Sequence, residues 1–119
     1  MENKYRNIPT VVDGITFPSR LEARRYTELQ LLKRAGEVVS FNRQVNYKIV
    51  VNGHHITTYR ADFVVLWKDG EETVEDTKGV KTPEYKIKAA LMKAVHGIEI
   101  TEIFAKNKIK KTFKKGKKS

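Results

Sequence analysis

The chain has 119 residues, no cysteine and a formal net charge of +10. The length predicts one domain with a single core, and the lack of cysteine excludes disulfides and thiolate metal sites. The apolar runs fall short of the roughly 20 residues of a membrane helix, and the polar start MENKYRN is unlike a secretory signal. We therefore expect a cytoplasmic protein that does not enter a membrane.

The positive charge is concentrated at the end of the sequence. Eight lysines lie in residues 106–119, which leaves about +2 for residues 1–105. We predict a single domain over residues 1–105 and a basic, flexible tail over residues 106–119. A polycation attracts polyanions, so nucleic acid is the expected partner. The alternative is a tail that only adds solubility.

A short hairpin and a helix are the first predicted elements. Asp13-Gly14 between apolar residues is a signal of a tight turn, so we expect a hairpin over residues 11–17. A helix follows, beginning at Ser19 and ending before Gly36. Residues at helical spacing predict its inward face: Leu21, Arg25 or Tyr26, Leu29 and Leu32.

Three strands are predicted next. Residues 38–41 form a short apolar piece, and residues 44–51 alternate like a strand. Asn52-Gly53 predicts a turn into a strand that runs to residue 66, and a turn over residues 68–70 leads into a strand ending at Lys78. Gln44 has the chemistry to hydrogen-bond water or a substrate, although one polar residue at a strand start usually has no function.

The second helix is predicted to begin at Pro83 and to end at His96-Gly97. Its expected apolar face consists of Tyr85, Ile87, Ala90, Leu91, Ala94 and Val95. A last strand follows around Ile98, Ile100 and Ile103. The order helix, three strands, helix, strand predicts an α/β fold with a mixed central sheet flanked by helices, in which the second helix crosses over between the third strand and the last.

Acidic residues interrupt two of the predicted strands. Side chains alternate along a strand, so Asp76 and Lys78 share one face while Glu75 and Thr77 point to the other, and we expect a surface role for Glu75. Asp62 has apolar neighbours on both faces, and burying an unpaired acid is costly. A divalent cation with an ammonium group beside it would stabilise these acids.

These residues resemble a known signature. Asp62 followed by Asp76-Thr77-Lys78 on the next strand resembles the PD-(D/E)XK nuclease superfamily, and the element order over residues 15–104 is similar to its restriction-endonuclease-like core, αβββαβ. The segments SRLEARRYTELQLLKRAGEV, YRADFVV, VEDTKG and TPEYKIKAALMKAVHGIEI further resemble a branch of small bacteriophage and prophage nucleases, which includes Holliday-junction-resolvase-like endonucleases. Ala61 stands where the superfamily name has proline.

The resemblance implies roles for individual residues. Asp62 and Asp76 would be metal ligands, and the backbone carbonyl of Thr77 would complete the metal shell. Lys78 would orient the attacking water and stabilise the charge that grows on the phosphate. Glu22 matches an acid that related nucleases carry on the first helix, which would make it a further ligand and part of the catalytic set.

Glu22 also has a local explanation. The segment Ser19-Arg20-Leu21-Glu22 fits a capping box, in which the glutamate side chain bonds the backbone amide of the serine. Both interpretations of Glu22 remain open from the sequence.

Carboxylate ligands without thiolate favour Mg²⁺, with Mn²⁺ as a substitute. By resemblance, the protein would be a metal-dependent endodeoxyribonuclease that cuts Holliday junctions or other branched DNA in phage recombination or replication, leaving 5′-phosphate and 3′-hydroxyl ends. Paired cuts across a junction need two sites, so we expect a homodimer. The alternative is a DNA-binding module that keeps the nuclease fold without cutting. Basic residues would bind the DNA backbone: Lys86, Lys88, Lys110, Lys111, Lys114 and Lys115.

Overall fold

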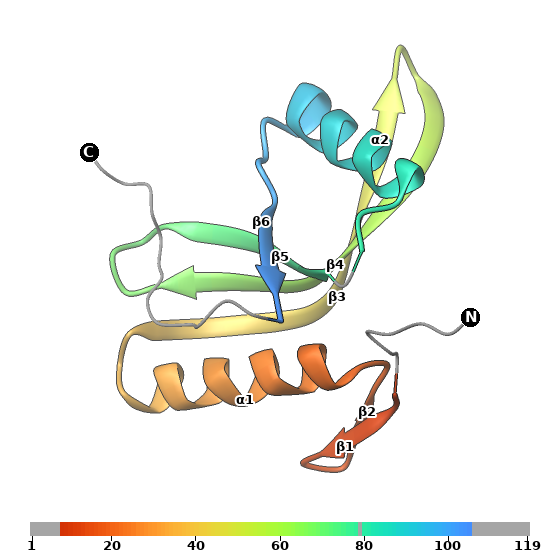
Figure 1. Ribbon diagram of the computed structural model, residues 1–119. Helices are drawn as coiled ribbons and strands as arrows, with labels where there is room; N and C mark the ends of the chain where they lie inside the picture. Colours follow the sequence, from red (N-terminus) through yellow and green to blue (C-terminus); the bar gives the residue numbers. More distant parts are fainter. Residues whose placement is uncertain (1–7, 79, 106–119) are drawn as a thin grey trace.

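The computed structural model describes residues 8–78 and 80–105 (Figure 1). The predicted order of helix, three strands, helix and strand is confirmed, with the short hairpin in front of it. In chain order the elements are β1 (Thr10–Val12), β2 (Ile15–Phe17), α1 (Arg20–Arg34), β3 (Val38–Val51), β4 (His54–Trp67), β5 (Glu72–Lys78), α2 (Pro83–Leu91), a π-helical turn η1 (Met92–His96) and β6 (Thr101–Phe104).

A four-stranded mixed sheet forms the centre of the molecule, in the order β3-β4-β5-β6. The first two pairings are antiparallel, and β6 pairs with β5 in parallel. Parallel neighbours need a crossover connection, which α2 supplies, as predicted. The protein is therefore a mixed α/β fold. Among the described residues, no helix is long and apolar enough to cross a membrane.

The predicted start and end of α1 are confirmed, and so are two of the predicted turns. Ser19 caps α1 by accepting a hydrogen bond from the Glu22 amide, and Gly36 follows the helix with a φ of 86°. The β1–β2 turn has positive φ at both Asp13 and Gly14, as two-residue hairpin turns require. The turn between β3 and β4 has the same feature at Asn52 and Gly53.

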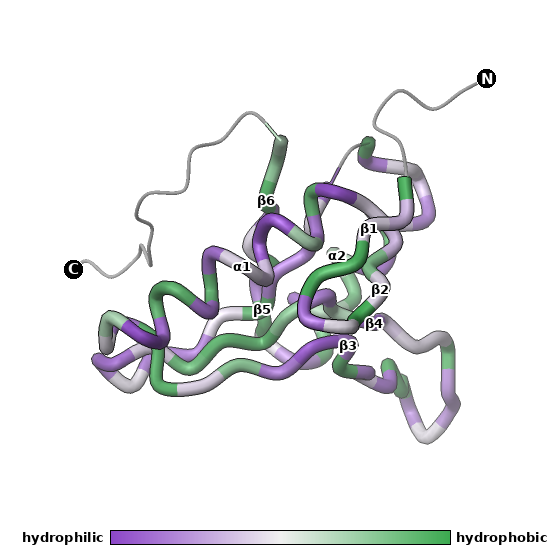
Figure 2. Tube along the Cα trace, turned by 90° about the horizontal axis from the view of Figure 1, so that it is seen from below, coloured by the Kyte–Doolittle hydropathy of each residue, from purple (hydrophilic) through white to green (hydrophobic). Residues whose placement is uncertain are grey.

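The prediction of two separate pieces at 38–41 and 44–51 is wrong, because β3 is one strand of 14 residues. Its polar middle, Asn42 to Gln44, stays within the strand because Asn42 and Arg43 pair with β4 before Gln44, and Val45 pairs after it in the same register. The β3–β4 hairpin extends past the rest of the sheet, and its far half stands beside α2 (Figure 1). The apolar segment 63–66 of β4 runs through the middle of the sheet (Figure 2).

Two core clusters cover opposite faces of the sheet. The α1 cluster comprises Phe17, Ala23, Tyr26, Leu29, Val38, Phe63, Val65 and Trp67. The α2 cluster comprises Ile49, Tyr59, Ala61, Val64, Val74, Tyr85 and Met92. Since Phe63 and Val64 are consecutive on β4, their membership of different clusters follows from the alternation of side chains along a strand. A residue two positions before Val64 therefore faces α2.

The predicted inward face of the second helix needs correction. Ile87 and Val95 are 61% and 38% exposed, whereas Tyr85 and Met92 are buried. The residues that face inward are Tyr85, Ala89 and Met92, at positions i, i+4 and i+7. After Leu91 the helix becomes a π-helical turn, so the spacing of an α-helix no longer predicts which side chains face the sheet. The last strand also begins later than predicted, because Ile98 and Ile100 pack against the α2 cluster ahead of β6.

Candidate active site

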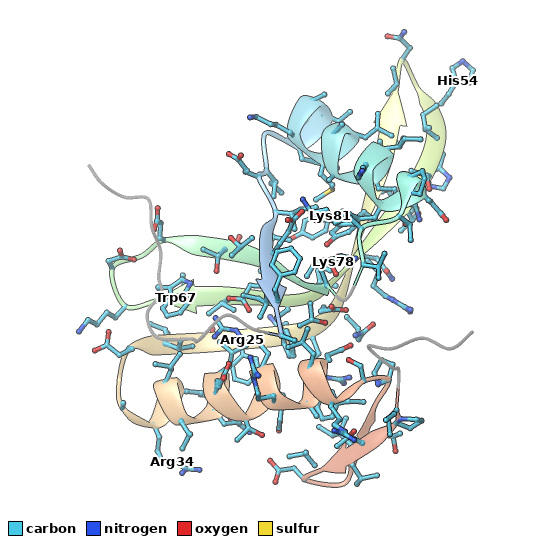
Figure 3. The ribbon with its side chains drawn as sticks, in the orientation of Figure 1. Arg25, Arg34, His54, Trp67, Lys78 and Lys81 are labelled. Carbon is cyan, nitrogen blue, oxygen red and sulfur yellow. The ribbon has the colours of Figure 1, made fainter. Side chains whose placement is uncertain are left out.

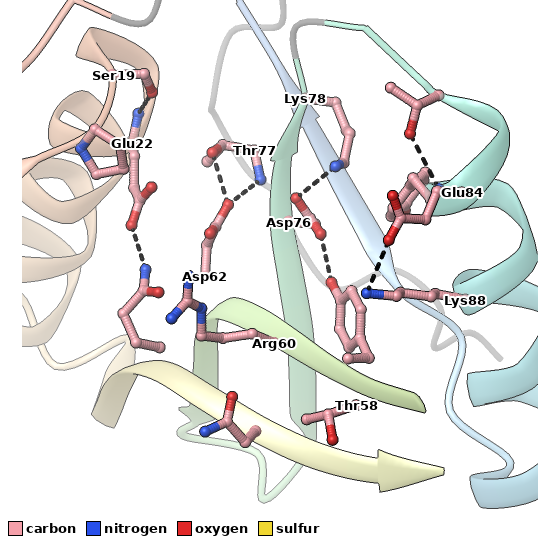
Figure 4. Close-up of a pocket in the computed structure, with 16 residues that line it drawn as sticks. Ser19, Glu22, Thr58, Arg60, Asp62, Asp76, Thr77, Lys78, Glu84 and Lys88 are labelled. Atoms are coloured by element: carbon pink, nitrogen blue, oxygen red, sulfur yellow. Dashed lines mark hydrogen bonds and ion pairs between the residues drawn. The ribbon is translucent and has the colours of Figure 1, made fainter. Parts of the chain in front are cut away.

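A pocket of about 620 Å³ opens where the β3–β4 hairpin passes between α1 and α2 (Figure 4). The structure brings most of the site residues predicted from the sequence to this one place. Its lining includes Glu22 from α1, Asp62 from β4, Asp76, Thr77 and Lys78 from β5, and Lys88 from α2.

Asp62 lies beside the end of β5 on the face that α2 covers. Phe63 pairs with Glu75, so Asp62 and Asp76 are the next residues along their strands and share the opposite face. The Oδ2 atom of Asp62 accepts hydrogen bonds from the backbone N–H and the Oγ1 hydroxyl of Thr77, both at 2.8 Å. Burial, and then the charge of Asp76, raises the pKa of Asp62 to about 6, against these hydrogen bonds and the charge of Lys78.

Asp76 is held on both of its oxygens. Lys78 Nζ lies 3.0 Å from Oδ1, and the buried Tyr59 hydroxyl donates to Oδ2 at 2.5 Å. Asp76 and Lys78 share a face, as predicted from strand alternation. Burial and the charge of Asp76 raise the pKa of Tyr59 above its usual value, which keeps the phenol protonated as a donor.

Lys78 also has an aromatic partner that the sequence analysis missed. Its Nζ lies 3.8 Å from the centroid of the Tyr85 ring, within the range of a cation–π contact. The Tyr85 hydroxyl donates to Glu102 on β6 at 2.8 Å, which fixes the ring. The ammonium group is thus held between a carboxylate and an aromatic face, on the α2 side of the sheet (Figure 3).

Glu22 combines features of both interpretations. Its amide donates to Ser19 Oγ at 3.1 Å, which is one half of a capping box. Its carboxylate, however, accepts a hydrogen bond from Gln44 Nε2 at 2.7 Å and lines the pocket. Burial, and then the charge of Asp62, raises the pKa of Glu22 to about 7, while Arg43 and Gln44 act in the opposite direction. The carboxylate is therefore turned toward the other acids.

The expected surface role of Glu75 is wrong. Glu75 is 1% exposed, and Arg25 of α1 donates to both of its oxygens, Nε at 2.7 Å and Nη2 at 2.6 Å. The face of β5 opposite to Asp76 is covered by α1, so a residue that alternation turns away from the pocket enters the core. Arg25 at an inward position of α1 was the signal in the sequence, since a buried guanidinium needs an acidic partner.

The predicted DNA-binding lysines divide into three groups. Lys88 is half-buried, lines the pocket and forms an ion pair with Glu84 at 3.4 Å. Lys86 is exposed and lies outside the pocket lining. The tail lysines, Lys110, Lys111, Lys114 and Lys115, lie outside the described residues.

Three further residues of the hairpin line the pocket: Asn46, Thr58 and Arg60. Thr58 and Arg60 precede Asp62 at intervals of two, so alternation along β4 was the signal that would have found them. They extend the pocket from the acids along the hairpin toward its turn.

The donor chemistry of the pocket suits a hard cation. Four carboxylates line it, those of Glu22, Asp62, Asp76 and Glu84, and the pKa values of Glu22 and Asp62 are raised because each is buried and lies near another acid. Oxygen donors with excess negative charge are what Mg²⁺ and Mn²⁺ bind. As positioned here, no three Asp, Glu, His or Cys side chains of the described residues form a group that would hold one ion.

The chain belongs to the family described as "Protein of unknown function (DUF1064)", whose model matches residues 2–117. No curated protein and no solved structure matches the chain.

Proposed function

We propose that this family member is a metal-dependent endonuclease that hydrolyses phosphodiester bonds of DNA. One observation carries the proposal: the carboxylates of Asp62 and Asp76, on neighbouring strands, line one pocket with Lys78 Nζ 3.0 Å from Asp76. Glu22 enters the same pocket from α1. An acid pair with an adjacent ammonium group suits phosphoryl chemistry, in which negative charge must be both attracted and stabilised.

A restriction-endonuclease-like core is part of the proposal. The order α1, β3, β4, β5, α2 and β6, with β6 parallel to β5, is the arrangement that the resemblance to the PD-(D/E)XK superfamily implies. The β1–β2 hairpin would then be an addition before this core. Family resemblance and element order support this fold together.

Asp62 and Asp76 would hold a Mg²⁺ or Mn²⁺ ion, with the Thr77 carbonyl and Glu22 as further ligands. A bound ion of this kind supplies Lewis acidity, which lowers the pKa of a water ligand and stabilises charge on phosphate oxygens. The residues around the acids hold them in place: Thr77 donates twice to Asp62, and Tyr59 donates to Asp76.

Lys78 would act directly on the substrate. From its position between Asp76 and the Tyr85 ring, its ammonium group would donate a hydrogen bond to a non-bridging oxygen of the scissile phosphate. Water attacks phosphorus and gives up a proton, the bond between phosphorus and the 3′ oxygen breaks, and the 3′ oxygen takes up a proton. The products carry 5′-phosphate and 3′-hydroxyl ends.

The DNA would bind chiefly through its backbone. Lys88 at the pocket, Lys86 beyond it and the tail lysines would neutralise phosphates without selecting a sequence. A single chain has one such pocket among its described residues, so paired cuts in a four-way junction require a homodimer. Light scattering at the concentration of the cleavage assay tests this: a monomer that resolves junctions would contradict the dimer.

The decisive experiment incubates supercoiled plasmid and four-way-junction DNA with the protein in Mg²⁺, in Mn²⁺ and in EDTA. We expect cleavage in either metal, and a loss of at least about 100-fold in rate for Asp76→Ala. Glu99→Ala is the matched control, because Glu99 is exposed and lies away from the pocket. Wild-type protein that binds DNA equally in EDTA and never cuts it would instead indicate a DNA-binding module with a nuclease fold.

A further inference from the structure

Gln44 has an unusual backbone conformation for a residue inside a strand. Its φ is 53°, in the left-handed region that residues with a Cβ rarely adopt. Two other non-glycine residues of the described chain have positive φ, Asp13 and Asn52, and both lie in hairpin turns. Strain of this kind concentrates at functional sites, so the position warrants a specific explanation.

Gln44 occupies the register position opposite Asp62, although these two residues do not themselves pair. Arg43 pairs with Phe63 and Val45 pairs with Ala61, with no register shift between these two pairs. The strain therefore does not arise from an inserted residue. Asp62 is in turn next to Asp76 across the β4–β5 pairing. Gln44 thus begins a row of three site residues across three neighbouring strands.

The strand also changes its packing partner at Gln44. Phe41, before it, packs against the α1 cluster, and Val45, after it, packs against the α2 cluster. The left-handed backbone of Gln44 therefore lies between the part of β3 that packs against the α1 cluster and the part that packs against the α2 cluster. A purely structural role for the conformation would be to bend the hairpin.

The side chain shows a second role. Gln44 Nε2 donates to Glu22 Oε2 at 2.7 Å, and both residues line the pocket. Arg43 Nη2 lies 3.9 Å from the same oxygen, which is a weaker contact. Glycine or asparagine would adopt this backbone more easily, but glycine has no amide and the asparagine amide is one methylene shorter. Glutamine adopts this backbone less easily, but its side chain is long enough for the amide to reach the Glu22 carboxylate.

We propose that Gln44 is a positioning residue, whose left-handed backbone directs its amide at Glu22 and holds that carboxylate in the pocket beside Asp62. The inference rests on the proposed nuclease function. It adds a residue outside the Asp62, Asp76 and Lys78 set to the machinery of the site. Residues that orient ligands in this way affect metal affinity or activity by roughly 10–100-fold.

A stability measurement tests the strained backbone without any assay of activity. Gln44→Gly and Gln44→Ala both remove the amide, but only glycine relieves the left-handed strain. We expect the melting temperature of Gln44→Gly to exceed that of Gln44→Ala by about 4–8 °C. Asn42, exposed on the same strand with a negative φ, supplies the control pair, in which Asn42→Gly should melt below Asn42→Ala. If the glycine variant melted below the alanine variant at both positions, the inference would be overturned.

Kinetics then separate bending from positioning. If Gln44 only bends the hairpin, Gln44→Gly retains wild-type cleavage, and the inference is overturned. If Gln44 positions Glu22, kcat falls by roughly 10–100-fold in Gln44→Gly while KM for DNA stays within about threefold. Asn42→Gly should keep wild-type kcat.

A second readout separates failure of this inference from failure of the proposed function. Should wild-type protein not cleave DNA, the nuclease proposal fails, and the rise in melting temperature with Mn²⁺ becomes the measurement. A rise in the wild type that is reduced in Gln44→Gly supports the positioning role. An equal rise in both, or none in the wild type, overturns it.

Discussion

The guanidinium of Arg25 spans both oxygens of the Glu75 carboxylate, with Nε 2.7 Å from Oε1 and Nη2 2.6 Å from Oε2. Both residues are buried, at 3% and 1% exposure, and the pair joins β5 to α1, whose Arg25 is labelled in Figure 3. Glu75 precedes Asp76 directly, so this pair fixes the strand that carries Asp76. The contact lies on the α1 side of the sheet, whereas Asp62 and Asp76 lie on the α2 side.

Removing one partner of this pair should destabilise the protein strongly. Arg25→Ala leaves the Glu75 carboxylate buried without its guanidinium, and such changes cost about 3–5 kcal/mol. Urea unfolding measures the loss. Lys68→Ala is the control, because the Lys68–Glu37 pair is on the surface and should contribute no more than about 1 kcal/mol. A cost for Arg25→Ala as small as that of the control would contradict a structural role for the pair.

The raised pKa of Glu22 predicts how stability depends on pH in the absence of divalent ions. Its usual value is 4.5, and burial followed by the Asp62 charge raises it to about 7 in the folded protein. Between these values the folded state holds a proton that the unfolded state has lost. The stabilisation that comes from protonated Glu22 is therefore fully present below about pH 4.5, and it is lost as the pH rises toward 7. Asp62, with a pKa of about 6, adds to the decline in the same direction.

Glu22→Gln should remove much of this dependence. The variant keeps a polar side chain but no longer ionises, so in EDTA at pH 8 it should be more stable than the wild type by about 1–3 kcal/mol. At pH 4 the two proteins should be similar. Urea unfolding across this pH range provides the measurement, with Glu99→Gln as an exposed control. If the wild-type protein instead became more stable from pH 5 to 8, ionisation of these buried acids would not destabilise the folded state, and the prediction would be wrong.

The ring of Tyr85 should matter more to activity than its hydroxyl group. Tyr85→Phe keeps the aromatic face under Lys78 and loses the hydrogen bond to Glu102. Tyr85→Leu removes the face itself, and a cation–π contact of about 1–2 kcal/mol corresponds to roughly a 5- to 30-fold loss in cleavage rate. We expect the phenylalanine variant to remain within about threefold of the wild type. Equal losses in both variants would assign the effect to the Glu102 contact.

Tyr59→Phe should reduce stability, because it removes a buried donor to Asp76 while keeping the ring. Leaving a buried acceptor without this partner costs about 1–3 kcal/mol. The free energy of unfolding is compared with that of Tyr47→Phe, whose half-buried hydroxyl makes no hydrogen bond to the site acids. We expect a change of no more than about 0.5 kcal/mol in that control. Similar values for the two variants would show that the Tyr59 contact contributes nothing.

The sequence by itself determined the elements and part of the site. Local rules located the turns at Asp13-Gly14 and Asn52-Gly53, the cap at Ser19 and the start of α2 at Pro83, because each depends on the backbone of a few adjacent residues. Strand alternation was enough to place Asp76 and Lys78 on one face. The nuclease function and the metal remain proposals that rest on these residues and on resemblance.

Only the tertiary structure decided which groups meet these residues. Gln44 reaches Glu22 across 22 positions of sequence, Tyr59 reaches Asp76 across 17, and Arg25 reaches Glu75 across 50. Alternation turned Glu75 away from the pocket but left open whether solvent or a helix lay on that side. Periodicity describes how a side chain is directed relative to its own strand or helix, whereas burial depends on which distant segment packs there. That is why the acids and Lys78 were found from sequence, whereas the contacts of Tyr59 with Asp76 and of Gln44 with Glu22 were not.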